Sequence, residues 1–304
     1  MKFLRAILVL GRVSNLPSVW SNCLCGWLVG MWCAREDQID WFVFGLLAAG
    51  ASGLYLGGMF LNDACDAWWD RKHRRERPIP SGVIREKTVW IIGIGLMAGG
   101  LSVICLQGGA TALMALLLFN LILVYNFGHK RLSWSPLLIA GCRLLLILIA
   151  ASHAHTYYSG TELAPEPFFK SIAGGRATWM ALVLFGYVAG LGWLAKSESV
   201  PAPVPVWPCV LFVLPIGLAV VVNGAEHRRD TLVMSAILGL WILRCLRSTF
   251  WTEEPDVGRT VGGLLAGIVL VDLLAAAVAP PALAAVFIGL FVLAIAAQRW
   301  VPAT

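Results

Sequence analysis

Long apolar segments recur along the whole chain and are separated by short polar links. A helix needs about 20 mostly apolar residues to cross the hydrocarbon core of a bilayer. Ten segments near this length occupy residues 15–33, 41–62, 88–107, 110–127, 132–152, 177–195, 206–223, 231–247, 258–278 and 281–299. They do not alternate apolar and polar residues as membrane strands do. The pattern predicts an all-α transmembrane bundle, formed by one domain over residues 1–304, with a tight hairpin at Ala279-Pro280-Pro281.

The composition agrees with a membrane protein and narrows its partners. Hydrophobic residues make up 59% of the chain and charged residues 13%, against about 25% charged in soluble domains. The eight cysteines lie mostly in apolar segments without metal-ligand spacing, which favours packing as small hydrophobes. The formal charge of +6 could suggest nucleic acid, but the basic residues lie in short links, where they act as topology signals. We therefore expect membrane lipids as partners and no nucleic acid.

The distribution of Lys and Arg predicts the orientation of the bundle. If the N-terminus is cytoplasmic and successive links alternate, 17 basic residues fall on one side and 5 on the other. Cytoplasmic links are the ones enriched in Lys and Arg. The link within residues 63–87 is therefore expected in the cytoplasm.

A polar cluster directly follows the second apolar segment. At 100° per residue, Asn62, Asp63, Asp66 and Asp70 lie at about 0°, 100°, 40° and 80°, so they share one helix face. Three neighbouring carboxylates with one amide are hard oxygen ligands of the kind that Mg²⁺ takes, together with substrate phosphates. Arg77 can bind phosphate as a fork. The alternative is a solvated loop in which acids balance bases, and the shared face beside a membrane helix disfavours it.

The same stretch resembles a known family motif. Residues Asn62 to Asp70, followed by R-P-x-P-S-G from Arg77 to Gly82, resemble the first aspartate motif of the UbiA superfamily of intramembrane prenyltransferases. Weaker matches extend the resemblance over most of the chain: Arg12-x-x-Asn15, Tyr125-Asn126 with Lys130-Arg131, and Gly141-x-Arg143.

The resemblance implies a polytopic bundle of about nine transmembrane helices and an activity. A central cavity open to lipid would be capped on the cytoplasmic side by acid motifs that bind Mg²⁺ and an isoprenoid diphosphate, and a small acceptor would attack the prenyl carbocation. Asp63, Asp66 and Asp70 would be catalytic and, with Asn62, would ligate the metal. The implied substrate-binding residues are Arg12, Asn15, Asn62, Arg77, Tyr125, Asn126, Lys130, Arg131 and Arg143.

The chain departs from the family where a second motif, D-x-x-x-D, is expected after the sixth helix. Residues 190–199 contain no Asp and offer Lys196, Ser197 and Glu198. Lys196 could contact the diphosphate as a point charge, or it could pair with Glu198 at a helix end. We include both among the catalytic candidates. This departure is similar to the divergent EboC-type branch found in bacterial operons, which implies the bacterial inner membrane and a cyclitol or another polar or aromatic acceptor.

Arg143 lies inside an apolar segment, where a charge faces a cavity or a partner. Binding of diphosphate or acceptor and pairing with an acid such as Asp272 are equally favoured. Two further functions stay open for the whole chain. A non-catalytic or weakly active lipid-diphosphate-binding subunit is compatible with the missing second motif. A transporter is disfavoured because the polar cluster lies at the membrane surface rather than at the midplane.

Overall fold

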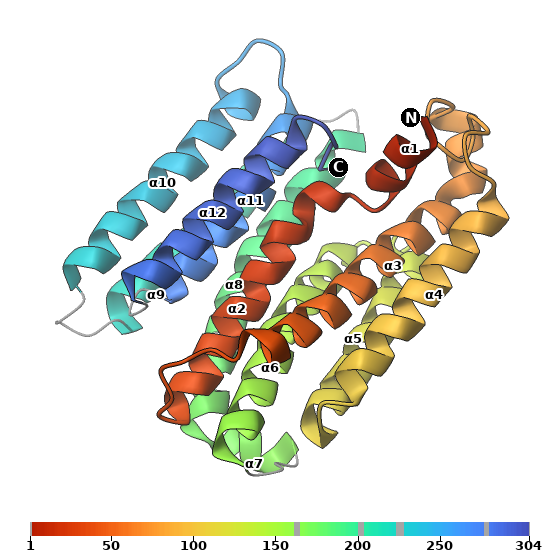
Figure 1. The fold of residues 1–304 in the computed structure, drawn as a ribbon. Helices are drawn as coiled ribbons and strands as arrows, with labels where there is room; N and C mark the ends of the chain where they lie inside the picture. The colour runs from red at the N-terminus through yellow and green to blue at the C-terminus, as the bar shows by residue number, and fades with distance from the viewer. Residues whose placement is uncertain (1, 161–164, 200–203, 223–227, 277–279, 304) are drawn as a thin grey trace.

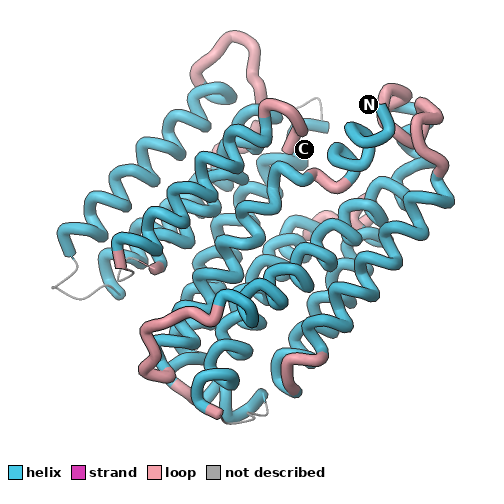
Figure 2. Tube along the Cα trace, viewed as in Figure 1, coloured by secondary structure: helices cyan, strands magenta, loops and turns pink. Residues whose placement is uncertain are grey.

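The computed structural model confirms an all-α fold. It describes residues 2–160, 165–199, 204–222, 228–276 and 280–303, and these contain helices and links but no strand (Figure 2). The α-helices are α1 (Lys2–Leu10), α2 (Leu16–Cys33), α3 (Trp41–His73), α4 (Glu86–Cys105), α5 (Gly109–Gly128), α6 (Ser135–Ser159), α7 (Pro165–Lys170), α8 (Ile172–Lys196), α9 (Leu214–Val222), α10 (Arg228–Phe250), α11 (Val257–Ala275) and α12 (Pro281–Gln298). Short 3₁₀ turns are η1 (Val13–Asn15), η2 (Ser197–Ser199) and η3 (Trp207–Val213).

Each of the ten apolar segments corresponds to a helix, and the seventh is formed by η3 followed by α9. Eight described helices are long and apolar enough to cross a membrane: α3, α4, α5, α6, α8, α10, α11 and α12. The helix α2 is outside this set because polar Ser18, Ser21 and Asn22 lie in its first two turns. The hairpin predicted before α12 falls partly on residues 277–279, outside the described part; Pro280 caps α12.

The helix α2 lies at the centre of the bundle and is almost entirely buried. Figure 1 shows α3, α4 and α5 on one flank and α9 to α12 on the other, with α2, α6 and α8 between them. Glycines allow α2 and α6 to touch through their backbones. A Cβ on Gly26 would lie 2.3 Å from the Ile147 carbonyl oxygen, and one on Gly30 would lie 2.3 Å from that of Ala151. Larger residues at these two positions would force the helices apart.

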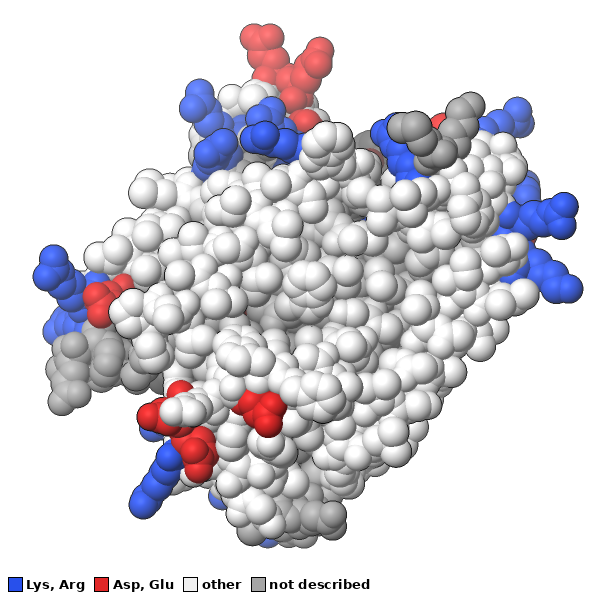
Figure 3. Space-filling view, in the orientation of Figure 1, with Lys and Arg blue, Asp and Glu red and all other residues white. Residues whose placement is uncertain are grey.

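Charged side chains gather at the ends of the bundle. Figure 3 shows an apolar band between two sets of charged residues on the visible face. Both termini, the α3–α4 link and the α10–α11 link lie at the same end (Figure 1). This arrangement is that of an integral membrane protein, and it places the acid-rich end of α3 beside several basic links.

Candidate functional site

A cavity of about 1000 Å³ lies between η1, α3, α5, α6, α8 and α11. Its lining includes twelve of the residues predicted from the sequence: Arg12, Asn15, Asn62, Asp66, Asp70, Arg77, Tyr125, Asn126, Lys130, Arg143, Lys196 and Glu198. Two predicted residues are not part of this lining. Asp63 is buried beside Arg77, and Arg131 is exposed on the α5–α6 link. We call the charged end, where α3 ends, the mouth of the cavity.

At the mouth, Arg77 bridges two carboxylates of α3. Its Nη1 lies 3.0 Å from Asp63 Oδ1 and 3.2 Å from Asp70 Oδ2. Asp70 occupies the last turn of α3, where the negative end of the helix dipole disfavours an acid, and Arg77 offsets that repulsion. The link places Arg77 by turning back on itself. Ser81 N–H donates to the Arg77 carbonyl at 2.9 Å, and Gly82 adopts the left-handed φ of 75° that the turn requires.

Lys130 and His129 hold Asp66. Lys130 Nζ lies 2.6 Å from Asp66 Oδ1, and His129 Nε2 lies 3.5 Å from Asp66 Oδ2. Lys130 Nζ also lies 5.2 Å from the ring centroid of Trp69, and the His129 ring stacks on Tyr125 at 5.0 Å. His129 and Trp69 were not predicted from the sequence, although both line the cavity. The spacing of four residues between Tyr125 and His129 puts them on one helix face and could have suggested the pair.

Two asparagines fasten α5 to α3 within the cavity wall. Asn62 Nδ2 donates to Asn126 Oδ1 at 3.4 Å, and Asn126 Nδ2 donates to the Gly58 carbonyl at 3.0 Å. Both side chains line the cavity. The amide oxygen of Asn62 therefore stays beside the carboxylates of the same helix.

The donor chemistry of the mouth fits a hard cation. The described residues contain no group of three or more His, Cys, Asp or Glu side chains arranged to hold a metal, because each carboxylate of the motif is held by a protein cation. Asp66, Asp70 and Asn62 nevertheless line the cavity. Mg²⁺ in proteins commonly takes one or two carboxylates and completes its shell with substrate phosphates and water. These three residues could hold a divalent metal if Arg77 and Lys130 release the carboxylates.

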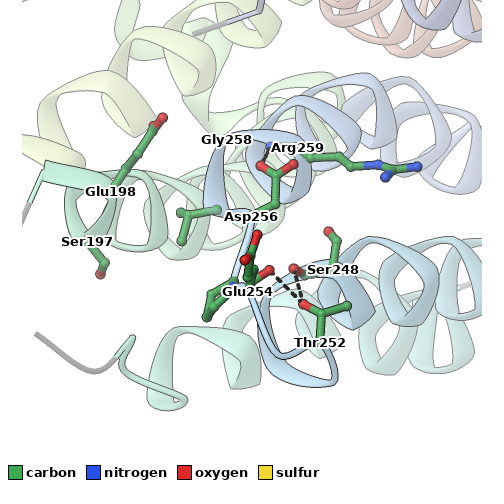
Figure 4. Close-up of a pocket in the computed structure, with 10 residues that line it drawn as sticks. Ser197, Glu198, Ser248, Thr252, Glu254, Asp256, Gly258 and Arg259 are labelled. Atoms are coloured by element: carbon green, nitrogen blue, oxygen red, sulfur yellow. Dashed lines mark hydrogen bonds between the residues drawn. The ribbon is translucent and has the colours of Figure 1, made fainter. Parts of the chain in front are cut away.

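The segment that replaces the second acid motif also lies at the mouth. Lys196 Nζ donates to the carbonyls of Leu132 and Ser133 at 3.2 and 3.1 Å, which ties the end of α8 to the α5–α6 link. Glu198 lines both the main cavity and a neighbouring polar pocket of about 580 Å³. In that pocket Asp256 caps α11 by accepting from Arg259 N–H at 2.8 Å. The Glu198 carboxylate lies beside the start of α11 (Figure 4), since a Cβ on Gly258 would be 3.1 Å from Glu198 Oε1.

Arg143 belongs to a buried polar network away from the mouth. Its Nη1 donates to Asn22 Oδ1 at 2.8 Å, and its Nη2 donates to Ser18 Oγ at 3.0 Å. Asn22 Nδ2 donates to Asp272 Oδ2 at 2.7 Å, and the Ser21 hydroxyl donates to the same oxygen. Both readings of Arg143 therefore have structural support: it is linked to Asp272 through Asn22, and it lines the cavity.

Known proteins share this sequence in part and this fold more widely. The sequence model of the UbiA prenyltransferase family matches residues 23–169. The digeranylgeranylglyceryl phosphate synthase of Metallosphaera sedula is 32% identical over 125 residues, which are 41% of this chain and 42% of that one. A protoheme IX farnesyltransferase of Cereibacter sphaeroides is 34% identical over 140 residues, 41% of each chain. The chain thus spans about two fifths of the length of these relatives.

Solved structures extend the similarity to nearly the whole chain. A structure from work on digeranylgeranylglyceryl phosphate synthase in membranes has a TM-score of 0.57 at 19% identity, covering 92% of this chain and 99% of that one. The structure of a UbiA homolog from Aeropyrum pernix has a TM-score of 0.66 at 15% identity, covering 86% and 96%. At these identities the match concerns the fold. The sequence match to the UbiA prenyltransferase family thus covers residues 23–169, just under half of the chain, and the wider similarity is one of fold.

Proposed function

We propose that this protein transfers a prenyl group from an isoprenoid diphosphate to a small acceptor inside the membrane, with Mg²⁺ as cofactor. The observation that carries the proposal is the single cavity that joins the charged mouth to apolar walls (lined in part by Leu54, Ile122, Leu146, Leu265 and Ile268). A prenyl diphosphate has the same division into a charged head and an apolar tail. The two curated relatives are named for a synthase of a geranylgeranylated lipid and a farnesyltransferase.

The residues of the mouth would bind the diphosphate end of the donor. Asp66 and Asp70, with Asn62, would hold Mg²⁺, which as a Lewis acid would stabilise charge on the leaving diphosphate. Arg77 and Lys130 now pair with the carboxylates. With Asp66 and Asp70 holding the metal, Lys130 and Arg77 would be available to the phosphate oxygens and would bind them by charge-assisted hydrogen bonds. Stabilising charge that develops on the leaving group is the largest contribution such residues make to rate.

The apolar walls would serve the other half of the reaction. They would hold the prenyl chain and keep water away from the allylic carbocation until the acceptor attacks. The lone cation of the second-motif segment, Lys196, would support the α5–α6 link that carries Lys130 and could contact the diphosphate. Arg131 on that link stays a predicted substrate contact.

The acceptor and the location of the protein are further parts of the proposal. A cyclitol or another polar or aromatic acceptor is suggested by the resemblance to the EboC-type branch. The bias of Lys and Arg supports a bacterial inner membrane with the mouth on the cytoplasmic side. Cysteine labelling at Ser81→Cys, on the exposed α3–α4 link, should then occur only from the cytoplasmic side of intact cells, and periplasmic labelling would overturn this orientation.

Diphosphate release by the purified full chain tests the activity. Cell-derived small molecules would be added as acceptors together with geranylgeranyl diphosphate, with Mg²⁺ or with excess EDTA. We expect release that requires both the acceptor fraction and Mg²⁺, and a matching prenylated lipid in mass spectra of cells that contain the active protein. Mg²⁺-dependent thermal stabilisation by the donor without any release would instead support a subunit that only binds lipid diphosphate. The replacement of the second acid motif by Lys196 and Glu198 is the observation that favours such a binding subunit.

A further inference from the structure

The side of the cavity near η1 and α6 holds one buried acceptor without a partner and an arginine with more N–H donors than its two hydrogen bonds use. Asn15 and Arg143 both line the cavity and are 5% and 8% exposed. Asn15 Nδ2 donates to the Ala303 carbonyl at 2.9 Å, but its Oδ1 has no hydrogen-bond partner in the described part of the chain. A guanidinium offers five N–H donors, and Arg143 uses two of its nitrogens on Asn22 and Ser18. One acceptor and several donors therefore face a cavity of ligand size.

These groups lie apart from the mouth. The Arg143 guanidinium carbon is 5.7 Å from the ring centroid of Tyr55, and Tyr55 precedes Asp66 on α3 by three helical turns, about 16 Å along the axis. Leaving a buried polar group unpaired is costly, and a charged one is rare within membrane helices. The unpaired groups therefore indicate a polar ligand atom on this side of the cavity.

Asp272 supplies a negative charge behind Arg143, but it is separated from the guanidinium by Asn22 and therefore takes up none of the Arg143 donors. Asp272, Asn22 and Ser21 are 0–1% exposed, and both hydrogen bonds to Asp272 come from α2. Asn22 thus accepts from Arg143 through its oxygen and donates to Asp272 through its nitrogen. In the flipped orientation the Asn22 NH₂ group would face the Arg143 donors and the Asn22 oxygen would face the Asp272 carboxylate. Asp272 therefore fixes the orientation of Asn22 and, through it, the position of Arg143.

We propose that Arg143 and Asn15 form a subsite for the acceptor, that Arg143 binds a carboxylate or phosphate oxygen there, and that Asp272 is the positioning residue of this subsite. Asn15 Oδ1 accepts from a hydroxyl of the same molecule. This inference rests on the proposed prenyl transfer for its biological meaning, but the binding itself can be measured without turnover.

Calorimetric titration of the detergent-solubilised full chain tests the subsite with three probes. Benzoate represents a carboxylate, glycerol 3-phosphate represents a phosphate, and inorganic diphosphate represents the ligand of the mouth. At least one of the first two should bind, and the tighter one identifies the anion. Asp272→Ala should weaken that probe at least about tenfold, because the bonded position of Arg143 is lost, and should change diphosphate affinity less than twofold. Asp272→Asn keeps an oxygen in reach of Ser21 and Asn22 and should restore affinity to within about threefold.

Thr260→Val is the matched control. Thr260 is fully buried on the same helix and bonds to Ser248 and Thr249, so its loss should lower stability and leave all three affinities unchanged. If Asp272→Ala does not fold, Ser21→Ala removes one bond to Asp272 and should cost about threefold in the same titration. The inference is overturned if neither anion binds, if the Asp272 or Ser21 variants match the control, or if diphosphate affinity falls equally. Failure of diphosphate binding in the wild type would instead count against the proposed prenyl transfer.

Discussion

The mouth of the cavity and the network behind Arg143 solve the same electrostatic problem in opposite ways. At the mouth, acids and bases touch directly. The Asp66–Lys130 pair is partly open to water, with side chains 14% and 34% exposed, whereas Asp63 and Asp70 beside Arg77 are 9% and 5% exposed. In the network, Arg143 and Asp272 are separated by the neutral amide of Asn22. Exposed ion pairs contribute little stability, so they can exchange partners easily, whereas a buried network that loses one member leaves a charge without compensation. We therefore expect the ion pairs of the mouth to exchange partners when a ligand binds, and the network around Arg143 to stay fixed.

The sharpest test of the exchangeable region is Asp66→Ala. It removes a carboxylate proposed to hold the metal and leaves Lys130 able to turn into water, so the fold should persist. Turnover should fall at least about 10²-fold, the cost of removing one group that stabilises charge in the transition state. Steady-state diphosphate release checks the rate, and circular dichroism checks the fold. Wild-type turnover in Asp63→Ala, Asp66→Ala and Asp70→Ala alike would remove the whole assignment.

Arg77→Lys asks whether the mouth needs a fork rather than a charge. Arg77 reaches both Asp63 and Asp70 through Nη1 alone, so its other nitrogens can bind phosphate as a fork, whereas a lysine binds phosphate only as a point charge. We expect turnover to fall about 10- to 100-fold with a raised KM for the donor. The control is Arg71→Lys in the last turn of α3, because Arg71 pairs with exposed Glu86 and should change turnover less than twofold. Equal effects of the two substitutions would contradict the proposal.

Lys196→Ala should have a smaller effect. Its bonds to the Leu132 and Ser133 carbonyls hold the link that carries Lys130, so the loss should be about tenfold if it acts by positioning. A 10²- to 10³-fold loss would indicate direct contact with the leaving group, and an unchanged rate would exclude both roles. A Mg²⁺ titration of the wild type adds a second readout, since steep cooperativity would require a second metal with other ligands.

The smallest effect is expected at the opposite end of α3. The Tyr157 hydroxyl, followed by the Val43 and Phe42 N–H groups, holds the pKa of the exposed Asp40 below its ordinary value. A lowered pKa stabilises the fold above the unfolded value of about 3.9, and this contribution disappears as the pH falls through the native value. The difference in Tm between wild type and Asp40→Asn should therefore be slight at pH 6 and should shrink as the pH falls below about 3.9. A difference that grows as the pH falls would contradict this sign.

Sequence reasoning was most successful where a local pattern carries the information. The ten apolar segments predicted the helices because the bilayer fixes their length, and twelve predicted site residues line one cavity. It did not predict that Asp63 lies outside the cavity lining, because helical angles do not show which side of a shared face Arg77 will occupy. Nor did it predict the relay through Asn22, which needs α2, α6 and α11 to meet at residues more than a hundred positions apart. His129 was also missed, because the resemblance in this stretch concerned only the residues on either side of it.

The close contact of α2 with α6 has a consequence for how this protein would tolerate variation. Gly26 and Gly30 touch no proposed ligand, yet any side chain there would meet a backbone carbonyl at 2.3 Å. In a saturation mutagenesis screen scored by growth, these two positions would tolerate as few substitutions as the residues of the mouth. Only a parallel measurement of protein abundance would separate them, since the glycine variants would disappear from the membrane while the Asp66 variants would accumulate in it, inactive.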